Sequence, residues 1–336
     1  MKTKNTQYRL RNWKEYNRSL TQRGSLTLWL DEEVVQAWRN AKKTGKRGAS
    51  KTYSDLAVTS CLSLGLLFRL PLRQSCGLIA SILVLLGASL PCPHFSTLSR
   101  RRSSLPVDLG IEKASSKNGG PEKGRYIALD STGLKIYGEG EWKVKKHGVG
   151  KRRTWRKLHL SVDVETGEIL ACEMTGGDAA DGPLLEFLVA SSEYVGGKVD
   201  KVSADGAYDS WAIDEYLAGK KIKALIPPGK GSKIRQRKRA DVVPLPRDER
   251  LRSIRRLGFG DFERGRRLWS KESGYSLRSL SETCMMRQKS VFGPSLRSRE
   301  ESGQRVECLL RCRVLNVLTR LGMPESYAFI PGKSTG

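Results

Sequence analysis

The stretch Arg125-Tyr-Ile-Ala-Leu-Asp-Ser-Thr-Gly133 decides the fold of the larger part of the chain. Its apolar run ends at Asp130 and small residues follow, which predicts a buried strand and then a turn. Strands are also expected at 157–163 and 169–173, and Glu165-Thr-Gly-Glu168 between them predicts a hairpin. Helices and strands then alternate: helix 182–191, strand 201–205, helix 210–218 and strand 223–227. This order predicts an α/β domain whose sheet has mixed strand directions.

A second aspartate has the same setting as Asp130. Asp205 ends the run Val-Ser-Ala and is followed by Gly-Ala-Tyr. A carboxylate at the end of a hydrophobic strand, facing a glycine turn, lies at a sheet edge where ligands bind. Asp before Ser or Gly also makes simple turns. One such aspartate fits the turn interpretation, whereas two on neighbouring strands favour a shared site.

The net charge of the chain indicates what kind of molecule it binds. Of its 336 residues, 61 are Lys or Arg and 35 are Asp or Glu, so the formal net charge is +26. A surplus of this size repels itself in the compact state unless a polyanion offsets it, and the usual polyanion is nucleic acid. A surface made cationic for solubility is the alternative. The hydrophobic fraction of 38% and the seven Trp residues argue against a wholly disordered chain.

Glu282 is the candidate third carboxylate, on a helix predicted over 275–293. At about 100° per residue, four polar side chains share one face of this helix: Tyr275, Arg278, Glu282 and Lys289. Four others share the opposite, core-facing side: Leu277, Leu280, Cys284 and Val291. Ser279-Leu-Ser-Glu282 also fits a capping box, in which Glu282 only satisfies amides at the start of the helix. If the helix begins at Ser279, the argument from the shared face covers only Glu282 and Lys289.

Two aspartates and a glutamate that converge suit a hard divalent cation, because such cations prefer carboxylate oxygens. A pair of these ions about 4 Å apart activates an attacking water and stabilises the leaving oxygen in phosphodiester displacement. In a strongly basic chain, such a site predicts a nuclease or a strand-transfer enzyme.

The residues before 124 differ from the rest of the chain in composition and in hydrophobic pattern. A polar arm, 1–49, precedes an apolar, helical block, 50–117, and residues 103–123 have the composition of a linker. A helix that is capped by Ser96 or Thr97 and ends in three arginines suits the second helix of a helix-turn-helix. Four of its residues are the candidates for reading base edges: Thr97, Ser99, Arg100 and Arg101. Three-helix cores that bind nothing are common, and it is the net charge that favours DNA binding here.

The rest of the chain is expected to form the α/β domain, 124–324, and a tail, 325–336. Residues 220–267 hold seventeen Lys or Arg against five acids, and 229–239 within them predict a mobile loop. The apolar run 76–90 is shorter than the ~20 residues of a membrane helix and predicts a buried core helix. The seven cysteines form no C-x-x-C pair, which predicts reduced thiols in a cytosolic protein.

Four residues carry a resemblance to a known family: Tyr275, Arg278, Glu282 and Lys289. Their spacing resembles the Tyr-Arg-Glu-Lys signature of bacterial insertion-sequence DDE transposases. The stretch 129–133 resembles the first-aspartate strand of that family, and 204–209 resembles the second. Trp155-Arg-Lys-Leu-His159 and Thr97-Leu-Ser-Arg-Arg101 are similar to the fifth insertion-sequence group of these enzymes. The likeness extends from about Tyr53 to Pro324.

The resemblance implies a ribonuclease H-like catalytic domain behind an all-α domain of the helix-turn-helix type. Asp130, Asp205 and Glu282 would hold two Mg²⁺ ions, for which Mn²⁺ would substitute. Three further residues would hold the DNA backbone near the transposon end: Tyr275, Arg278 and Lys289. His159, on the second strand, would also face the site and the DNA, and a surface histidine on a hairpin is the alternative.

The function implied is a DNA transposase that binds terminal inverted repeats, cleaves the ends by metal-dependent hydrolysis and joins the 3′ ends to target DNA. Its partners would be double-stranded DNA and a second copy of the chain in the synaptic complex, in the bacterial cytoplasm at the nucleoid and without a membrane. Two alternatives are a ribonuclease H-like nuclease without strand transfer and a catalytically inactive DNA-binding derivative. The intact carboxylates and their spacing argue against the second.

Overall fold

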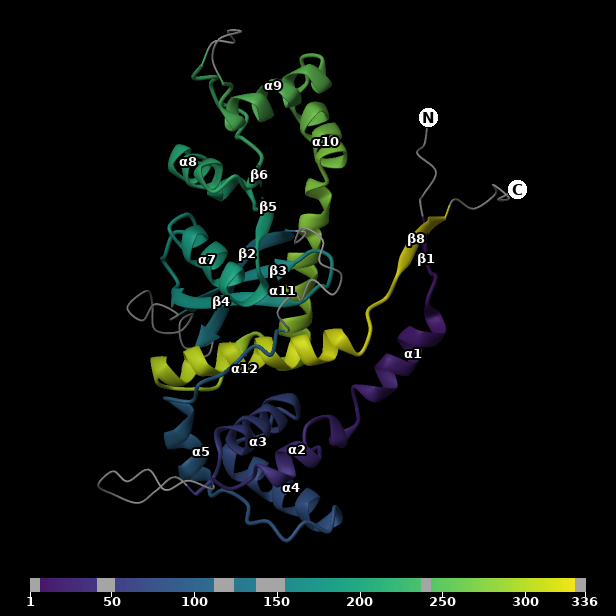
Figure 1. The fold of residues 1–336 in the computed structure, drawn as a ribbon, viewed down its shortest axis with the longest axis vertical. Helices are drawn as coiled ribbons and strands as arrows, with labels where there is room; N and C mark the ends of the chain where they lie inside the picture. Colours follow the sequence, from purple (N-terminus) through teal and green to yellow (C-terminus); the bar gives the residue numbers. More distant parts are fainter. Residues whose placement is uncertain (1–6, 41–51, 112–123, 137–154, 237–242, 330–336) are drawn as a thin grey trace, which may run out of the picture.

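The computed structural model describes residues 7–40, 52–111, 124–136, 155–236 and 243–329. Its centre is a six-stranded sheet (Figure 1), whose main path has the order β4-β3-β2-β5-β6. These strands are β2 (Arg125–Ile136), β3 (Trp155–Asp163), β4 (Ile169–Gly176), β5 (Val199–Ser203) and β6 (Lys223–Leu225). β3 runs antiparallel to β2 and β4, whereas β5 runs parallel to β2 and β6 parallel to β5. The predicted α/β class with mixed strand directions is confirmed.

Strand β2 is longer than the sequence predicted. It passes through Asp130 and continues to Ile136, and it pairs with β3 as far as Trp155. Gly133 permits this close pairing, because a Cβ atom there would lie 3.2 Å from the Trp155 ring. The short strand β7 (Ser295–Leu296) then pairs in parallel with the end of β2. The predicted turn after Asp130 is therefore wrong, and this aspartate lies in the middle of a strand.

Helices cover both faces of the sheet (Figure 1). On one face, α7 (Leu184–Gly196) and α8 (Trp211–Gly219) enclose a core that includes Ile127 and Leu129 of β2. On the other face, α11 (Ser279–Phe292) and α12 (Glu301–Arg320) enclose a core that includes Leu134 of β2. Because side chains alternate along a strand, Asp130 shares the α11 side with Leu134.

The N-terminal part is helical, as predicted. Its elements are α1 (Trp13–Gln22), the 3-10 turn η1 (Leu26–Leu28), α2 (Glu32–Gln36), α3 (Asp55–Leu67), α4 (Leu72–Leu85) and α5 (Phe95–Arg102). The expected arm, where the structure describes it, is joined to the rest of the molecule. Trp38 is fully buried and its Nε1 donates a hydrogen bond to the carbonyl of Pro91 at 2.9 Å. At the other end, β1 (Gln7–Leu10) pairs antiparallel with β8 (Ser326–Phe329), inside the expected tail.

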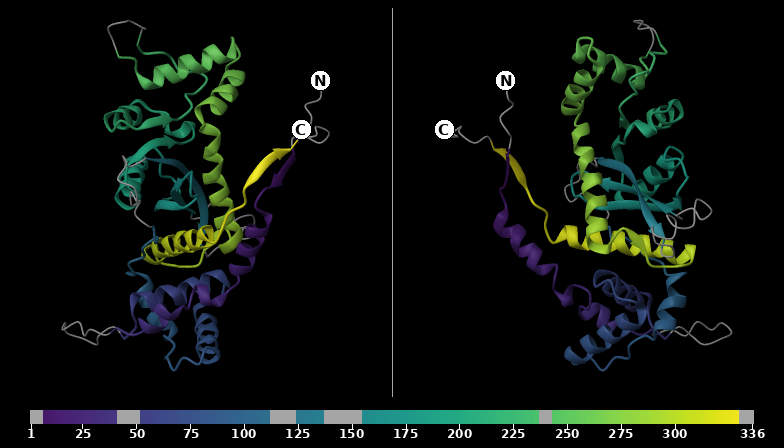
Figure 2. Two further views of the ribbon diagram at one scale, coloured as in Figure 1. Left: turned by 45° about the vertical axis from the view of Figure 1, so that its right-hand side comes forward. Right: turned by 180° about the vertical axis from the view of Figure 1, so that it is seen from behind.

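Figure 2 shows the β1–β8 ribbon standing apart from the central sheet. Residues on the two sides of the boundaries predicted at 49 and 324 therefore pack or pair with one another. The linker predicted at 103–123 also differs in its described part, since Leu105 and Leu109 are buried. Its remainder, 112–123, lies outside the described residues. The core of the helical block continues into the α/β domain, because Leu98 of α5 and Leu310 of α12 belong to one hydrophobic cluster.

The apolar run 76–90 is only partly a core helix. α4 begins earlier, at Leu72, and ends at Leu85. Ile79, Ile82 and Leu83 are buried, whereas Val84 and Leu85 are 77% and 83% exposed. Within the described residues, no single helix is both long enough and apolar enough to cross a membrane; α3 and α4 together pass that test, but they meet at a bend of 111°.

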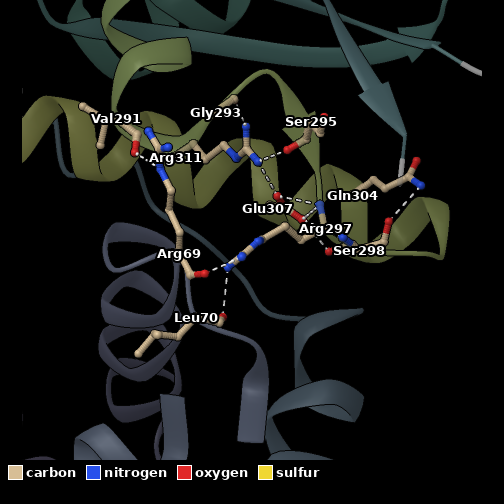
Figure 3. Close-up of polar contacts among 10 residues, drawn as sticks. All are labelled: Arg69, Leu70, Val291, Gly293, Ser295, Arg297, Ser298, Gln304, Glu307 and Arg311. Carbon is tan, nitrogen blue, oxygen red and sulfur yellow. Dashed lines mark hydrogen bonds and ion pairs between the residues drawn. The ribbon is translucent and has the colours of Figure 1, made fainter. Parts of the chain in front are cut away.

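Arginines join the helical block to the α/β domain (Figure 3). Arg69, in the turn between α3 and α4, donates to the carbonyls of Ser290 and, at 3.0 Å, Val291 at the end of α11. In the opposite direction, Arg297 donates to the carbonyls of Arg69 and, at 3.0 Å, Leu70. The two segments therefore hold each other through main-chain acceptors.

Behind this junction lies a buried ion pair, Arg311–Glu307, on one face of α12 (Figure 3). Neither side chain is more than 2% exposed, and their N–O distance is 2.6 Å. The Glu307 carboxylate also accepts from the amides of Arg297 and Ser298 and from the Ser298 hydroxyl. These donors offset the desolvation of the carboxylate, which is otherwise a large cost of burying a charge.

A helical hairpin projects from the sheet at the end opposite the helical block (Figures 1 and 2). It consists of α9 (Pro246–Gly258) and α10 (Phe262–Ser273). The helices meet closely at Gly265, where a Cβ atom would lie 2.0 Å from the Ile254 carbonyl oxygen. The sequence predicted only a basic region here, because few of its side chains are apolar.

The mobile loop predicted at 229–239 is wrong for its described part, 229–236. The buried carboxylate of Asp248 accepts from the amides of Arg235 and Gln236 at 2.8–3.1 Å. Arg255 also donates to the carbonyl of Ser232. Residues 237–239 lie outside the described residues. Polar contacts from α9, rather than apolar packing, fix this loop.

Candidate active site

The three candidate carboxylates come from three different elements. Asp130 lies in the middle of β2, Asp205 follows the end of β5, and Glu282 lies in the first turn of α11. The Asp130 side chain is 17% exposed and accepts a hydrogen bond from the amide of Ser131 at 2.9 Å. Glu282 is more open, at 56% exposure. Asp130 and Glu282, which are more than 150 positions apart in the sequence, both lie within reach of Arg278 on the α11 side of the sheet.

Arg278 links two of these carboxylates. Its guanidinium pairs with Glu282 one turn later and lies 3.7 Å from an oxygen of Asp130. The guanidinium also lies 5.8 Å from the centre of the Tyr275 ring. Tyr275 and Arg278 belong to a 3-10 turn, η3 (Tyr275–Arg278), that leads directly into α11. The spaced signature is therefore a turn plus a helix, not one continuous helix.

The pKa of Asp130 shows how the charges act on one another. Burial raises the pKa of this carboxyl above its usual value. The Ser131 amide and Arg278 lower it, and the negative charges of Asp205 and Glu282 raise it further. The negative charges of both other carboxylates therefore act on Asp130. A cation placed among the three would relieve this repulsion.

The capping-box interpretation of Glu282 is not what the structure has. Helix α11 begins at Ser279 without a side-chain cap, and Arg278 occupies the N-cap position. Glu282 accepts from Arg278 instead. The predicted core side is also partly wrong, because Leu277 is 46% exposed and the buried residues of α11 are Ser281, Cys284, Met285, Gln288 and Phe292. Glu282 and Lys289 are both exposed on the polar side, as predicted.

Asp205 combines the two roles considered for it. Its side chain accepts from the amide of Ala207 at 2.9 Å and caps the 3-10 turn η2 (Gly206–Tyr208), so it does form a turn. Its negative charge also raises the pKa of Asp130 and the pKa of the Tyr275 hydroxyl. Buried Tyr208 lies among the same carboxylates, and burial together with Asp181, Asp205 and Asp130 raises its pKa.

His159 is placed differently from the prediction. It pairs across the sheet with Ser131, one residue from Asp130, so alternation puts it on the opposite face of the sheet. The side chain is fully buried, with Nδ1 3.1 Å from Asp181 and Nε2 2.9 Å from the Thr175 hydroxyl. Burial lowers its pKa to about 4, so the ring is neutral at pH 7. Both DNA contact by His159 and the surface-histidine alternative are therefore wrong.

Two charged groups near the site were not predicted from the sequence. Asp181 accepts from Lys157 at 2.9 Å and carries the charge that faces His159. Arg266 of α10 lowers the pKa of Tyr275 and so lies near its hydroxyl. Trp269, one turn further along α10, is buried and lies 5.4 Å from the Tyr275 ring. A prediction of α10 as a helix would have placed Arg266 and Trp269 on one side of it.

Helix α5 carries the residues expected to read DNA. It begins after His94, whose ring accepts from the amide of Ser96, so the predicted caps Ser96 and Thr97 are wrong. Arg101 is only 11% exposed: it pairs with Asp55 and donates to the Tyr53 carbonyl at 2.8 Å. This inward contact removes Arg101 from the set of free base readers. Residues 86–94 separate α4 from α5, which is longer than the turn of three or four residues in a helix-turn-helix.

The chemistry of the donor set fits a divalent cation, because all three side chains offer hard carboxylate oxygens. As the chain stands, however, Arg278 lies between Asp130 and Glu282. Among the described residues, no three His, Cys, Asp or Glu side chains are placed so that they could hold a metal ion. The seven cysteines are all unpaired.

Comparison with known proteins identifies the family of the chain. Two family profiles match the chain, and both are described as "Transposase DDE domain": one over residues 21–139 and the other over 121–317. Among solved structures, the chain is similar to one titled "Cryo-EM structure of piggyBac transposase synaptic complex with hairpin DNA", at 12% identity and a TM-score of 0.37, with 88% of this chain and 75% of that chain covered. The longer profile match spans more than half of the sequence. On that match, the chain belongs to the DDE transposase family.

Proposed function

We propose that this transposase binds the terminal inverted repeats of an insertion sequence, hydrolyses the 3′ ends and joins the freed 3′-hydroxyls to target DNA. The observation that carries the proposal is the position of Arg278 between Asp130 and Glu282, together with the effect of the Asp205 and Glu282 charges on the partly buried Asp130 carboxyl. The sheet order, with β3 antiparallel, supports a ribonuclease H-like catalytic domain. The substrate is double-stranded DNA, and the reaction takes place in the cytoplasm, at the nucleoid.

In this proposal Asp130, Asp205 and Glu282 hold two Mg²⁺ ions, with Mn²⁺ as a substitute. When bound, such ions supply an activated water and stabilise the leaving oxygen. Carboxylates are the ligands that these ions prefer. The raised pKa of Asp130 supports this assignment, because a buried carboxyl beside two negative charges is stabilised by added positive charge.

In this proposal Arg278 first pairs with carboxylates of the site and then with a DNA phosphate. Without DNA it neutralises Asp130 and Glu282. Once those carboxylates are otherwise neutralised, its guanidinium is free to bind a phosphate of the transposon end in the bidentate way that favours arginine. Lys289 is exposed two turns after Glu282 on the same helix, and the charges of Arg278 and Arg266 both act on the Tyr275 hydroxyl. These groups position the backbone and do not read bases.

Recognition of the repeat is assigned to the helical block. Ser99 and Arg100 are exposed on α5 and Thr97 is partly exposed, so these three remain the proposed base readers. Synapsis of two ends requires at least two copies of the chain. The exposed arginines of the α9–α10 hairpin add backbone contacts that do not depend on sequence.

The test uses labelled duplexes of the candidate transposon end, a supercoiled plasmid and Mg²⁺. The proposal predicts cleaved ends and plasmid-joined product, both abolished by EDTA. Cleavage without joining would instead identify a nuclease without strand transfer. Specific binding without cleavage in either Mg²⁺ or Mn²⁺ would identify a catalytically inactive DNA-binding derivative, and either result would contradict the proposal.

A further inference from the structure

Two buried Asp–Arg pairs join the α9–α10 hairpin to the sheet domain. Arg247 binds Asp209 through two parallel hydrogen bonds, Nε to Oδ1 at 2.8 Å and Nη2 to Oδ2 at 2.7 Å. Arg250 binds Asp214 at 2.8 Å. Exposure of all four side chains is 9% or less. The two pairs are thus matched in chemistry and burial, and both arginines come from α9.

Only one pair reaches the segment that carries Asp205. The Asp205 carboxylate caps the turn η2 at its start, and Asp209 ends the same turn, with its amide donating to the Gly206 carbonyl at 3.1 Å. Asp205 and Asp209 are therefore the two ends of one short turn. Asp214, by contrast, lies within α8, beyond that turn.

Several contacts hold Arg247 itself in place. It donates to the Ser232 hydroxyl at 3.1 Å, and its guanidinium lies 4.7 Å from the centre of the Trp211 ring. Asp209 accepts a further hydrogen bond from the amide of Gly229 at 3.4 Å. These contacts fix the far end of the Asp205 turn, whereas the hydrogen bond that caps the turn uses only Oδ1 of Asp205.

We propose that Asp209 and Arg247 are positioning residues that fix the orientation of Asp205 for metal binding. The inference rests on the proposed function, because it takes Asp205 to be a metal ligand. Groups that orient a ligand without touching the metal commonly contribute 10- to 100-fold to metal affinity. The Asp214–Arg250 pair should contribute to folding without this effect, since it does not touch the Asp205 turn.

The test is an EPR titration of the full chain with Mn²⁺ alone, in which Arg247→Lys is compared with Arg250→Lys. Lysine keeps the charge but cannot form the two parallel hydrogen bonds. We expect Arg247→Lys to weaken Mn²⁺ binding about 10- to 100-fold, in line with the effect of removing an orienting group. Arg250→Lys should leave it within about threefold, and both variants should lower the melting temperature to a similar extent.

A second pair of variants, Asp209→Asn and Asp214→Asn, repeats the comparison with shape-conserving changes, in case a lysine variant does not fold. Equal Mn²⁺ affinities in the matched variants would overturn the inference. Asp130→Asn separates this failure from a failure of the proposed function. If the unaltered chain has no Mn²⁺ site that Asp130→Asn abolishes, the proposed function is wrong and the inference falls with it.

Discussion

Arginines at the two ends of this transposase have different roles. At the junction of the helical block with α12, Arg69, Arg297 and Arg311 donate to carbonyls or to Glu307 (Figure 3). On the α9–α10 hairpin, Arg256, Arg264 and Arg267 are exposed. The formal charge of +26 counts both kinds equally. Arg69 and Arg297 are exposed residues, but their guanidinium groups donate to main-chain carbonyls, and Arg311 is buried. The net charge therefore overstates the number of guanidinium groups that are free to bind DNA.

The largest effect is expected where the charge is most deeply buried. Glu307→Ala leaves Arg311, which is 0% exposed, without its carboxylate partner. Breaking a buried ion pair in this way costs about 3–5 kcal/mol of unfolding free energy. Urea denaturation of the variant and the unaltered chain measures this. If the unfolding free energy changed by less than about 1 kcal/mol, the range of surface ion pairs, the Arg311–Glu307 pair would contribute no more than an exposed pair does, and the comparison with the hairpin would fail.

The buried side of the comparison also predicts a pH dependence. The folded-state pKa of His159 is lowered to about 4, below its ordinary value of 6.5. Between these values the unfolded chain binds more protons, so stability is complete above pH 6.5 and is lost as the pH falls toward 4. The loss due to this group is about 3 kcal/mol. Melting temperatures from pH 7 to pH 4.5 should fall less steeply in His159→Gln, and identical slopes would contradict the assignment.

A smaller effect is expected at the exposed edge of the junction. Arg297→Ala removes the donors to the carbonyls of Arg69 and Leu70. Such hydrogen bonds contribute about 1 kcal/mol each, and less where water replaces them. The matched control is Arg299→Ala, an exposed arginine two residues away. Thermal unfolding should separate the two variants, and equal melting temperatures would show that Arg297 does not join the domains.

The smallest effect on stability is expected on the hairpin. Replacing Arg256, Arg264 and Arg267 together with Ala should change the unfolding free energy by less than about 0.5 kcal/mol for each site. Binding of random duplex DNA should weaken, and the slope of log K against log salt should fall by roughly 0.9 for each phosphate that is no longer neutralised. Gel shifts across a salt series measure the slope. An unchanged slope would mean that these arginines do not bind DNA.

The sequence predicted those parts of the fold that depend on local periodicity. The strand and helix order from 125 to 225 follows from the apolar runs, and the helix that carries Glu282 was also predicted, although it begins at Ser279 and not at residue 275. Alternation along β3 was also present in the sequence, yet His159 was placed on the wrong face, because the pairing of His159 with Ser131 was unknown. One residue of register decides which face of a sheet a side chain reaches.

Features held by polar contacts could not be predicted in the same way. The α9–α10 hairpin packs at Gly265 and is anchored by Arg247 and Arg250, so its sequence lacks a broad apolar stripe. Arg101 has the composition of a DNA-contacting residue but pairs with Asp55, 46 positions earlier. The resemblance to transposases named more candidate site residues than composition did, because the spacing of the family signature selects Glu282 and Arg278.

We propose that Asp130, Asp205 and Glu282 act together as ligands of the metal ions that DNA cleavage requires. The most direct measurement is Mg²⁺-dependent cleavage of an end duplex by Asp130→Asn, Asp205→Asn and Glu282→Gln, each at saturating DNA, with Asp163→Asn as a control from a buried carboxylate paired with Arg125. Each of the three variants should lose at least about a hundredfold in rate, because each keeps the shape of a ligand but removes its charge, while DNA binding is retained. Cleavage by any one of the three at the rate of the unaltered chain would contradict the account and remove that residue from the site.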